Sequence, residues 1–269
     1  MKKIVHISDV HFGDTDPVVV DELHTKIVEI SPDLLVVSGD LTQRARRDQF
    51  RDAKDFIDRF PMPKIVVPGN HDVPLYRVVE RFSAPFRNYD EYFGDHEPWF
   101  FDGEIAAVGV NTARAFVFKG GRINKDQVER LKERLGDLDD SVLKIVVSHH
   151  PFDLPEGSDD DDIVGRADRY MSALALCGAD VFLAGHLHVS SITSSAFRYK
   201  IDSERAALVI QAGTAASMRE RGEENSFNLL EYERPFLTVK RYQCAIPSEG
   251  FHLAGDKKYA QSERGWSLL

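Results

Sequence analysis

The sequence predicts an α/β fold, in which strands and helices alternate through the first half of the chain. Short apolar runs recur there without polar alternation, as in parallel strands covered on both faces. Apolar residues at helical spacing lie between these runs. A chain of 269 residues is long enough for one large domain. We expect that domain to span residues 1–244, and the tail 245–269 shows no clear period.

The first elements are three strands separated by two helices. The strands are predicted at the apolar runs 4–8, 34–38 and 64–67. The first helix follows Asp16-Pro17, an N-cap and a proline at the first helical position, and has an apolar face of Val20, Leu23, Ile27 and Ile30. The second helix carries apolar residues at the same spacing before Pro61, namely Phe50, Ala53, Ile57 and Phe60.

The next part of the chain begins less regularly. Residues 74–98 are rich in aromatic and charged side chains, which indicates an irregular helix plus loop. A helix begins at Asn124-x-x-Gln127, which resembles a capping box, and another includes Met171–Cys177. After His188, strands follow one another without helices. The strands predicted from residue 104 onward are 104–110, 142–148, 180–184, 192–199, 206–211, 227–232 and 236–242. These elements together predict a mixed sheet, or two packed sheets, with helices outside.

Composition excludes some classes of function. The net charge of −10 argues against a nucleic-acid-coating surface, which should be basic. No run approaches the roughly 18 apolar residues of a membrane span. The two cysteines, Cys177 and Cys244, match no zinc or redox spacing, so we expect a cytoplasmic protein. The four carboxylates at 159–162 resemble a calcium or metal loop, but such a run is more often a solvated turn. The sequence is compatible with a homo-oligomer as well as with a monomer.

Metal-binding side chains follow five of the predicted strands directly. These residues are Asp9 and His11, Asp40, Asn70 and His71, His149, and His186 and His188. Because the carboxyl ends of parallel strands meet at one edge of a sheet, we expect these side chains to converge. Carboxylate, imidazole and amide ligands suit Mn, Fe or Zn. The order of the motifs therefore predicts a binuclear metal site.

Each fragment alone has a more ordinary interpretation. Asp9 and Asp40 could be helix N-caps in βα loops, and Gly69-Asn70 could be a turn. His149 could be a buried, hydrogen-bonded histidine. His186 and His188, on an extended segment, could lie on the surface. The five fragments together are poorly explained in these ways.

With these motifs, the chain resembles the calcineurin-like metallophosphoesterases from Ile4 to about His188, and within them the bacterial class III cyclic nucleotide phosphodiesterases. The resemblance implies a four-layer α/β/β/α sandwich and makes 1–244 a metallophosphoesterase domain. It also implies that one metal ion, divalent or trivalent, is bound by Asp9, His11, Asp40 and His188. The second would be bound by Asp40, Asn70, His149 and His186, with Asp40 bridging.

The same resemblance places His71 beside the scissile phosphate as the catalytic residue, bound to neither metal. Asn70 and His150 are candidate substrate contacts. Alternation along an extended segment would direct His150 away from its neighbour His149. Arg219 and Arg221 follow Gly213-Thr214, which resembles a loop at the active-site mouth. For these arginines, an ordinary charged turn in water is an equal alternative.

The implied reaction is in-line attack of a metal-bridging hydroxide on a cyclic nucleotide or other small phosphodiester. Gln43 departs from the phosphoprotein phosphatases, which have an aspartate there to orient the catalytic histidine. This departure leaves open which group holds His71. The alternatives are a phosphomonoesterase or pyrophosphatase acting on a nucleotide or lipid precursor, and a non-catalytic scaffold.

Overall fold

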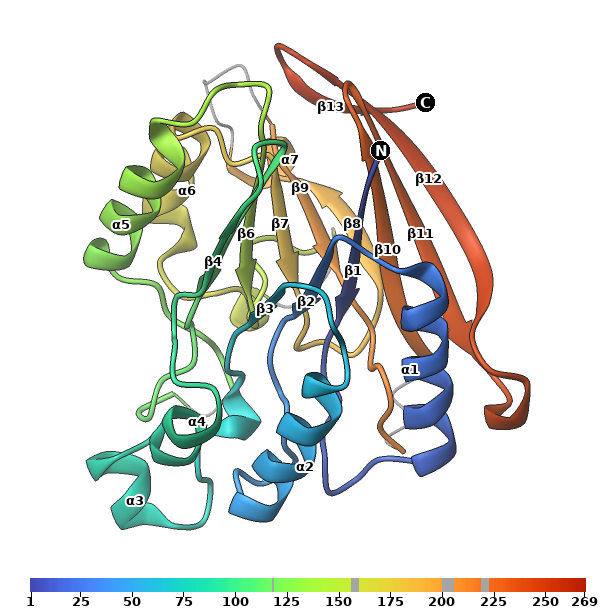
Figure 1. Ribbon diagram of the computed structural model, residues 1–269. Coiled ribbons are helices and arrows are strands. Elements are labelled where there is room, and N and C mark those ends of the chain that lie inside the picture. The colour runs from blue at the N-terminus through green and yellow to red at the C-terminus, as the bar shows by residue number, and fades with distance from the viewer. Residues whose placement is uncertain (118, 156–159, 200–205, 219–222) are drawn as a thin grey trace.

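The computed structural model describes residues 1–117, 119–155, 160–199, 206–218 and 223–269. In this part of the chain, two β-sheets pack face to face and helices cover both outer faces (Figure 1). This arrangement confirms the predicted four-layer α/β/β/α sandwich. The helices α1 and α2 lie on one side of Figure 1, and α5 and α6 lie on the other.

The first sheet contains the chain's earliest and latest strands. Its order is β13 (Gly265–Leu268), β12 (His252–Ser262), β11 (Phe236–Cys244), β10 (Asn225–Glu233), β1 (Lys2–Ile7), β2 (Leu34–Val37) and β3 (Lys64–Val66). The strands β1, β2 and β3 are parallel, whereas β10 pairs antiparallel with β1, and β11 to β13 continue antiparallel.

The second sheet is mainly parallel and is built from the middle of the chain. Its order is β4 (Trp99–Phe101), β5 (Ile105–Val110), β6 (Leu143–Ser148), β7 (Val181–Ala184), β9 (Leu208–Gln211) and β8 (Ser191–Ser194). Only the edge strands β4 and β8 pair antiparallel.

The longer helices form where the sequence predicts helices. The longer ones are α1 (Pro17–Ile30), α2 (Arg47–Asp58), α5 (Lys125–Gly136) and α6 (Ala167–Leu176). The short ones are α3 (Val78–Ser83), α4 (Arg87–Tyr92), α7 (Ala196–Tyr199) and the single 3₁₀ turns Asn70–Asp72, Asp160–Asp162 and Pro247–Glu249. Asp16 caps α1 by accepting from Val18 N–H at 2.8 Å, and Asn124 caps α5 by accepting from Gln127 N–H at 3.0 Å.

Alternation along each strand separates three apolar layers. In β1, Ile4 faces the second sheet, whereas Val5 and Ile7 face α1 and α2. In β6, Ile145 faces the first sheet and Val146 faces α5 and α6. Burial of both faces explains why these strands lack polar alternation in the sequence. The layers fix the strands in register, and their carboxyl ends emerge on one side of the sandwich (Figure 1).

The predicted strand 192–199 is wrong in its second half. The strand β8 pairs with β9 only as far as Ser194, opposite Leu208. The Ser195 hydroxyl then accepts from the backbone N–H of Ala207 at 3.1 Å, the Ser195 N–H donates to the Ala207 carbonyl at 3.0 Å, and the chain turns into α7.

The segment 245–269, for which the sequence showed no period, contains β12 and β13. Seven consecutive residues of β12, from His252 to Lys258, are exposed, so no apolar alternation marks the strand. Its buried residue Tyr259 and Trp266 of β13 join the apolar layer between the sheets. The Trp266 indole N–H donates to the carbonyl of Asp180 at 3.1 Å. Within the described residues, no helix is long and apolar enough to cross a membrane.

The contacts of Trp266 predict that the end of the chain stabilises the fold. We expect Trp266→Ala to lower the free energy of unfolding by about 3 kcal/mol, because it removes a large buried side chain and one hydrogen bond. The matched control is Leu268→Ala, since Leu268 is 62% exposed on the same strand, and it should cost less than about 0.5 kcal/mol. Urea unfolding of both variants measures the difference. Equal, small effects would mean that β13 contributes nothing to the core.

Candidate metal centre

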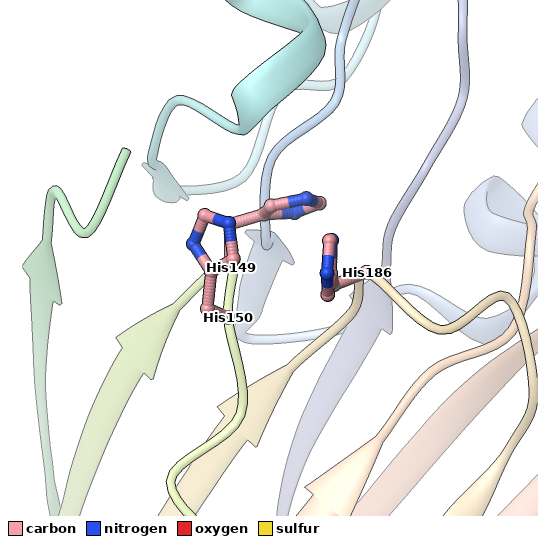
Figure 2. A group of neighbouring side chains, drawn as sticks. All are labelled: His149, His150 and His186. Atoms are coloured by element: carbon pink, nitrogen blue, oxygen red, sulfur yellow. The ribbon is translucent and has the colours of Figure 1, made fainter. Parts of the chain in front are cut away.

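Loops after five strands bring the predicted ligands together at the carboxyl edge of the two sheets. Two groups form, with one nitrogen or oxygen atom per residue lying within 4.8 Å of the others in its group. The first group is Asp9, His11, Asp40 and His188, and the second is His149, His150 and His186. Figure 2 shows the second group, in which His149 and His150 follow β6 and His186 follows β7.

The first group is buried and faces inward. His11 Nε2 and His188 Nε2 lie 3.4 Å apart, and Asp9 Oδ1 lies 3.5 Å from His188 Nε2. His188 Nδ1 is 2.7 Å from the Thr214 hydroxyl. Donation from Nδ1–H to Thr214 would leave the Nε2 lone pair directed at the group. Among the described residues, Asp9 Oδ1 has no hydrogen-bond partner. A buried, unpaired carboxylate oxygen beside two imidazole nitrogens fits a bound cation.

The second group converges on the amide oxygen of Asn70. Its Oδ1 lies 3.0 Å from His149 Nε2 and 3.1 Å from His186 Nδ1. His149 Nδ1–H donates to the carbonyl of Ser38 at 2.8 Å, which orients Nε2 toward Asn70. A cation bound here would replace the proton on Nε2 and would be coordinated by the imidazole nitrogens and the amide oxygen. The second group is therefore also suited to a cation.

Asp40 belongs to the first group and also faces the second. Its Oδ2 is 3.8 Å from His11 Nε2, and its Oδ1 is 3.4 Å from His149 Nε2. Oδ1 also accepts from the backbone N–H of His71 at 2.8 Å. One carboxylate thus presents an oxygen to each group, which is the geometry required of a bridging ligand.

The electrostatics favour ionised carboxylates among mostly neutral imidazoles. Burial alone would raise the pKa of Asp40, but His149 and His71 hold it well below its usual range. Burial lowers the pKa of His11 to about 3 and that of His186 to about 4, so both rings keep a free lone pair at neutral pH. Burial opposes a charge on His149 too, but Asp40 raises its pKa to about 9. The carboxylates therefore attract positive charge to this position.

The backbone at the site is strained. Eight non-glycine residues of the described chain have φ between 50° and 78°, and five of them are predicted ligands: Asp9, His11, Asp40, His186 and His188. Left-handed conformations of this kind cost free energy and gather at functional sites. Close packing adds a second constraint, because a Cβ on Gly69 would lie 2.1 Å from Asp40 Oδ1. Only glycine at position 69 lets the Asn70 loop approach the Asp40 carboxylate.

The structure identifies a group that orients His71. Its Nδ1 lies 3.0 Å from the backbone carbonyl of Gln43, and its ring stands edge-on to that of His11, with centroids 4.8 Å apart. The Gln43 side chain turns elsewhere and donates from Nε2 to Asp14 Oδ2 at 2.7 Å. The backbone carbonyl of Gln43 therefore orients His71, in the place of the aspartate side chain that this sequence lacks at position 43.

Asp72 is a positioning residue to which sequence reasoning assigned no role. Its buried carboxylate accepts from the backbone N–H groups of Leu41, Thr42 and Gly69, at 3.1, 2.9 and 2.9 Å. These bonds tie the loop after β2 to the loop after β3, and so place Asp40 beside His71. Burial, with Asp40 nearby, raises the pKa of Asp72 to about 6. The signal for Asp72 in the sequence was its position directly after His71.

His150 does not point away from His149, as strand alternation predicted. The chain bends at these residues, and the two ring centroids lie 4.9 Å apart. His150 Nδ1 lies 2.8 Å from the Thr112 hydroxyl and Nε2 lies 2.8 Å from the carbonyl of Lys119. Its ring is fully buried. These contacts do not favour the substrate role, which stays a prediction.

Two other predicted features lie partly or wholly outside the described residues. Arg219 and Arg221 are both outside them, as is Asp159. Asp162, from the same acidic run, has its Oδ1 3.9 Å from His186 Nε2. At least one carboxylate of the expected solvated turn therefore lies against the metal centre.

Comparison with known proteins agrees with this fold. The chain is 30% identical over 121 residues to a Synechococcus protein named a probable cyclic nucleotide phosphodiesterase, covering 45% of this chain and 43% of the relative. It is 25% identical over 183 residues to an Arcobacter nitrofigilis protein named a probable glycerophosphodiester phosphodiesterase, covering 64% and 62%. The matches thus span about half of each relative's length.

Solved structures share the fold. A purple acid phosphatase from yellow lupin seeds superposes with a TM-score of 0.71 at 12% identity, over 96% of this chain and 53% of that one. A dimetal phosphatase from Danio rerio gives 0.67 at 14% identity, over 97% and 99%. At these identities the likeness concerns the fold alone.

The chain is thus a two-sheet α/β protein with a cluster of Asp and His side chains, suited to metal ions, at its strand ends. The model of the calcineurin-like phosphoesterase family matches residues 2–190. The chain belongs to this family.

The position of Asp40 predicts its effect on metal content. We expect Asp40→Ala to bind one metal ion per chain or none, because both groups lose the only carboxylate they share. The matched control is Asp33→Ala, at the opposite end of β2, where the carboxylate accepts from Lys3 N–H at 2.8 Å. Elemental analysis after Mn²⁺ loading and gel filtration gives the stoichiometry. Two ions in the Asp40→Ala protein would refute the bridging assignment.

Proposed function

We propose that the chain is a metal-dependent phosphodiester hydrolase acting on a cyclic nucleotide or another small phosphodiester. The observation that most supports this is the single carboxylate of Asp40 between two ligand groups, with His71 hydrogen-bonded to it. Two ions of Mn, Fe or Zn held there would activate water and offset charge on a phosphoryl group.

The chain's own residues divide the remaining work. Asp9, His11 and His188 would hold one ion, and Asn70, His149 and His186 would hold the other, with Asp40 available to both. His71 stays outside both sets. Its Nδ1–H donates to the Gln43 carbonyl, so Nε2 is the nitrogen that protonates a leaving oxygen or donates to a phosphoryl oxygen.

The partner of His71 favours diesters with good leaving groups. A carboxylate at this position would stabilise the charged imidazolium, whereas the Gln43 carbonyl offers only a dipole. The names of the two curated relatives described above point the same way.

Phosphomonoesterase or pyrophosphatase activity is the alternative, since the same metals serve it. A shorter match supports the pyrophosphatase: 32% identity over 77 residues to a Chlamydia muridarum protein named UDP-2,3-diacylglucosamine pyrophosphatase. The cytoplasmic location stays a prediction.

If His71 acts on the substrate and binds no metal, activity and metal content should separate. We expect His71→Ala to lower kcat by ~10²–10⁴-fold, the usual range for a general acid, with two ions still bound. The control is His252→Ala, an exposed histidine on β12, which should change neither quantity. Loss of metal together with activity would make His71 structural.

Because His71 Nδ1 is paired with a backbone carbonyl and not with a carboxylate, we predict a preference for diesters. We expect kcat/KM for bis-p-nitrophenyl phosphate to exceed clearly that for p-nitrophenyl phosphate, with Mn²⁺ at neutral pH. The two substrates share the same leaving group, so the ratio of their kcat/KM values reports the effect of the second ester group alone. A ratio well below one would favour the monoesterase, and metal binding without any turnover would favour the scaffold.

A further inference from the structure

A cavity of about 690 Å³ adjoins the second ligand group. Two segments line it: Val117 with residues 119–122, between β5 and α5, and residues 161–163 with Gly165 and Arg166, between β6 and α6. The backbone N–H of Gly165 donates to the carbonyl of Gly121 at 2.8 Å, and that of Ile123 donates to Gly165 at 3.3 Å. These bonds hold the two segments together along the cavity.

The cavity is joined to the metal centre through residues that contact both. Lys119 lines the cavity, and its carbonyl accepts from His150 Nε2 at 2.8 Å. Gly121 packs against the His150 ring, where a Cβ would lie 2.4 Å away. Asp162 lines the cavity and has Oδ1 3.9 Å from His186 Nε2. A molecule with one group at the second ligand group can therefore extend another into the cavity.

The side chains of the cavity are unusually cationic for a chain with a net charge of −10. Lys119, Arg122 and Arg166 line it, against two carboxylates, Asp161 and Asp162. Within the described residues, neither Arg122 nor Arg166 forms an ion pair, so both guanidinium groups can bind a ligand. Asp162 Oδ1 lies 3.9 Å from His186 Nε2, so this carboxylate borders the second ligand group, and the three cationic side chains still outnumber the two carboxylates. Guanidinium groups bind phosphate and carboxylate through paired N–H donors.

We propose that this cavity binds a second anionic group of the substrate, a phosphate or a carboxylate, while the scissile phosphodiester lies at the metal centre. The proposal rests on the proposed function and narrows its substrate class to small phosphodiesters that carry a further anion. Lys119, Arg122 and Arg166 are then the residues that select the substrate.

Binding of unreactive analogues to the Mn²⁺-loaded full chain tests this without relying on turnover. Titration calorimetry compares propyl phosphonate, which has one anionic group, with trimethylene diphosphonate and phosphonobutyrate, which add a phosphonate or a carboxylate. We expect at least one of the two longer ligands to bind about tenfold more tightly than propyl phosphonate. The ligand that gains more identifies the second anion as phosphate or carboxylate.

Substitutions at the cavity locate the effect. Arg122→Gln and Arg166→Asn should each remove most of the tenfold advantage and leave binding of propyl phosphonate unchanged. Asparagine is chosen because position 166 has φ of 73°, which asparagine tolerates. The control is Arg264→Gln on the turn between β12 and β13, which should change nothing.

Two results would overturn the cavity assignment: equal affinity for all three ligands in the unmodified protein, or an advantage that both cavity variants keep. Hydrolysis of bis-p-nitrophenyl phosphate by the same samples reports separately on the proposed function. Hydrolysis without any advantage for a second anion overturns the cavity assignment alone. An advantage that the variants remove, without any hydrolysis, supports the cavity and overturns the diesterase.

Discussion

The buried carboxylate of Asp40 needs positive charge on two sides, and much of the surrounding structure serves that need. Its oxygens face His11 on one side and His149 on the other. An ionised carboxylate in a buried site is costly unless it is paired or binds a cation. Neutral His11 and His186 cannot supply that charge, and a single proton on His149 supplies it on one side only. Metal ions in both groups satisfy the requirement symmetrically.

The two sheets make this arrangement possible by delivering ligands from opposite halves of the sandwich. The loops of β1, β2 and β3 come from the first sheet, and those of β6 and β7 come from the second. Hydrogen bonds then lock the loops together across the gap: Asp9 Oδ2 accepts from the N–H of His186 at 3.0 Å. The free energy of burying three apolar layers offsets the strain of the left-handed ligand residues. Rigidity at the site is thus a consequence of packing throughout the domain.

The sequence was sufficient for features that repeat or that lie next to one another. Continuous apolar runs predicted the buried strands, and the side chains following them predicted the ligand groups. Features that depend on contacts between residues far apart in the chain could not be predicted from the sequence. The eleven-residue strand β12 is mostly exposed and has no period, so it is defined by its pairing with β11 and β13. The bend at His149 and His150 reversed an argument based on alternation. The carbonyl that orients His71 belongs to the backbone, which no residue type reveals, and the approach of Asp162 to His186 depends on tertiary folding.

The Asp40 carboxylate is proposed to lie between two metal ions, one on each side. Anomalous diffraction from crystals of the full chain soaked in Mn²⁺ tests it most directly, because it locates each ion independently of activity. The account predicts two anomalous peaks, one among Asp9, His11 and His188 and the other among Asn70, His149 and His186, with an Asp40 oxygen bound to each. A single peak, or peaks that Asp40 does not contact, would contradict it.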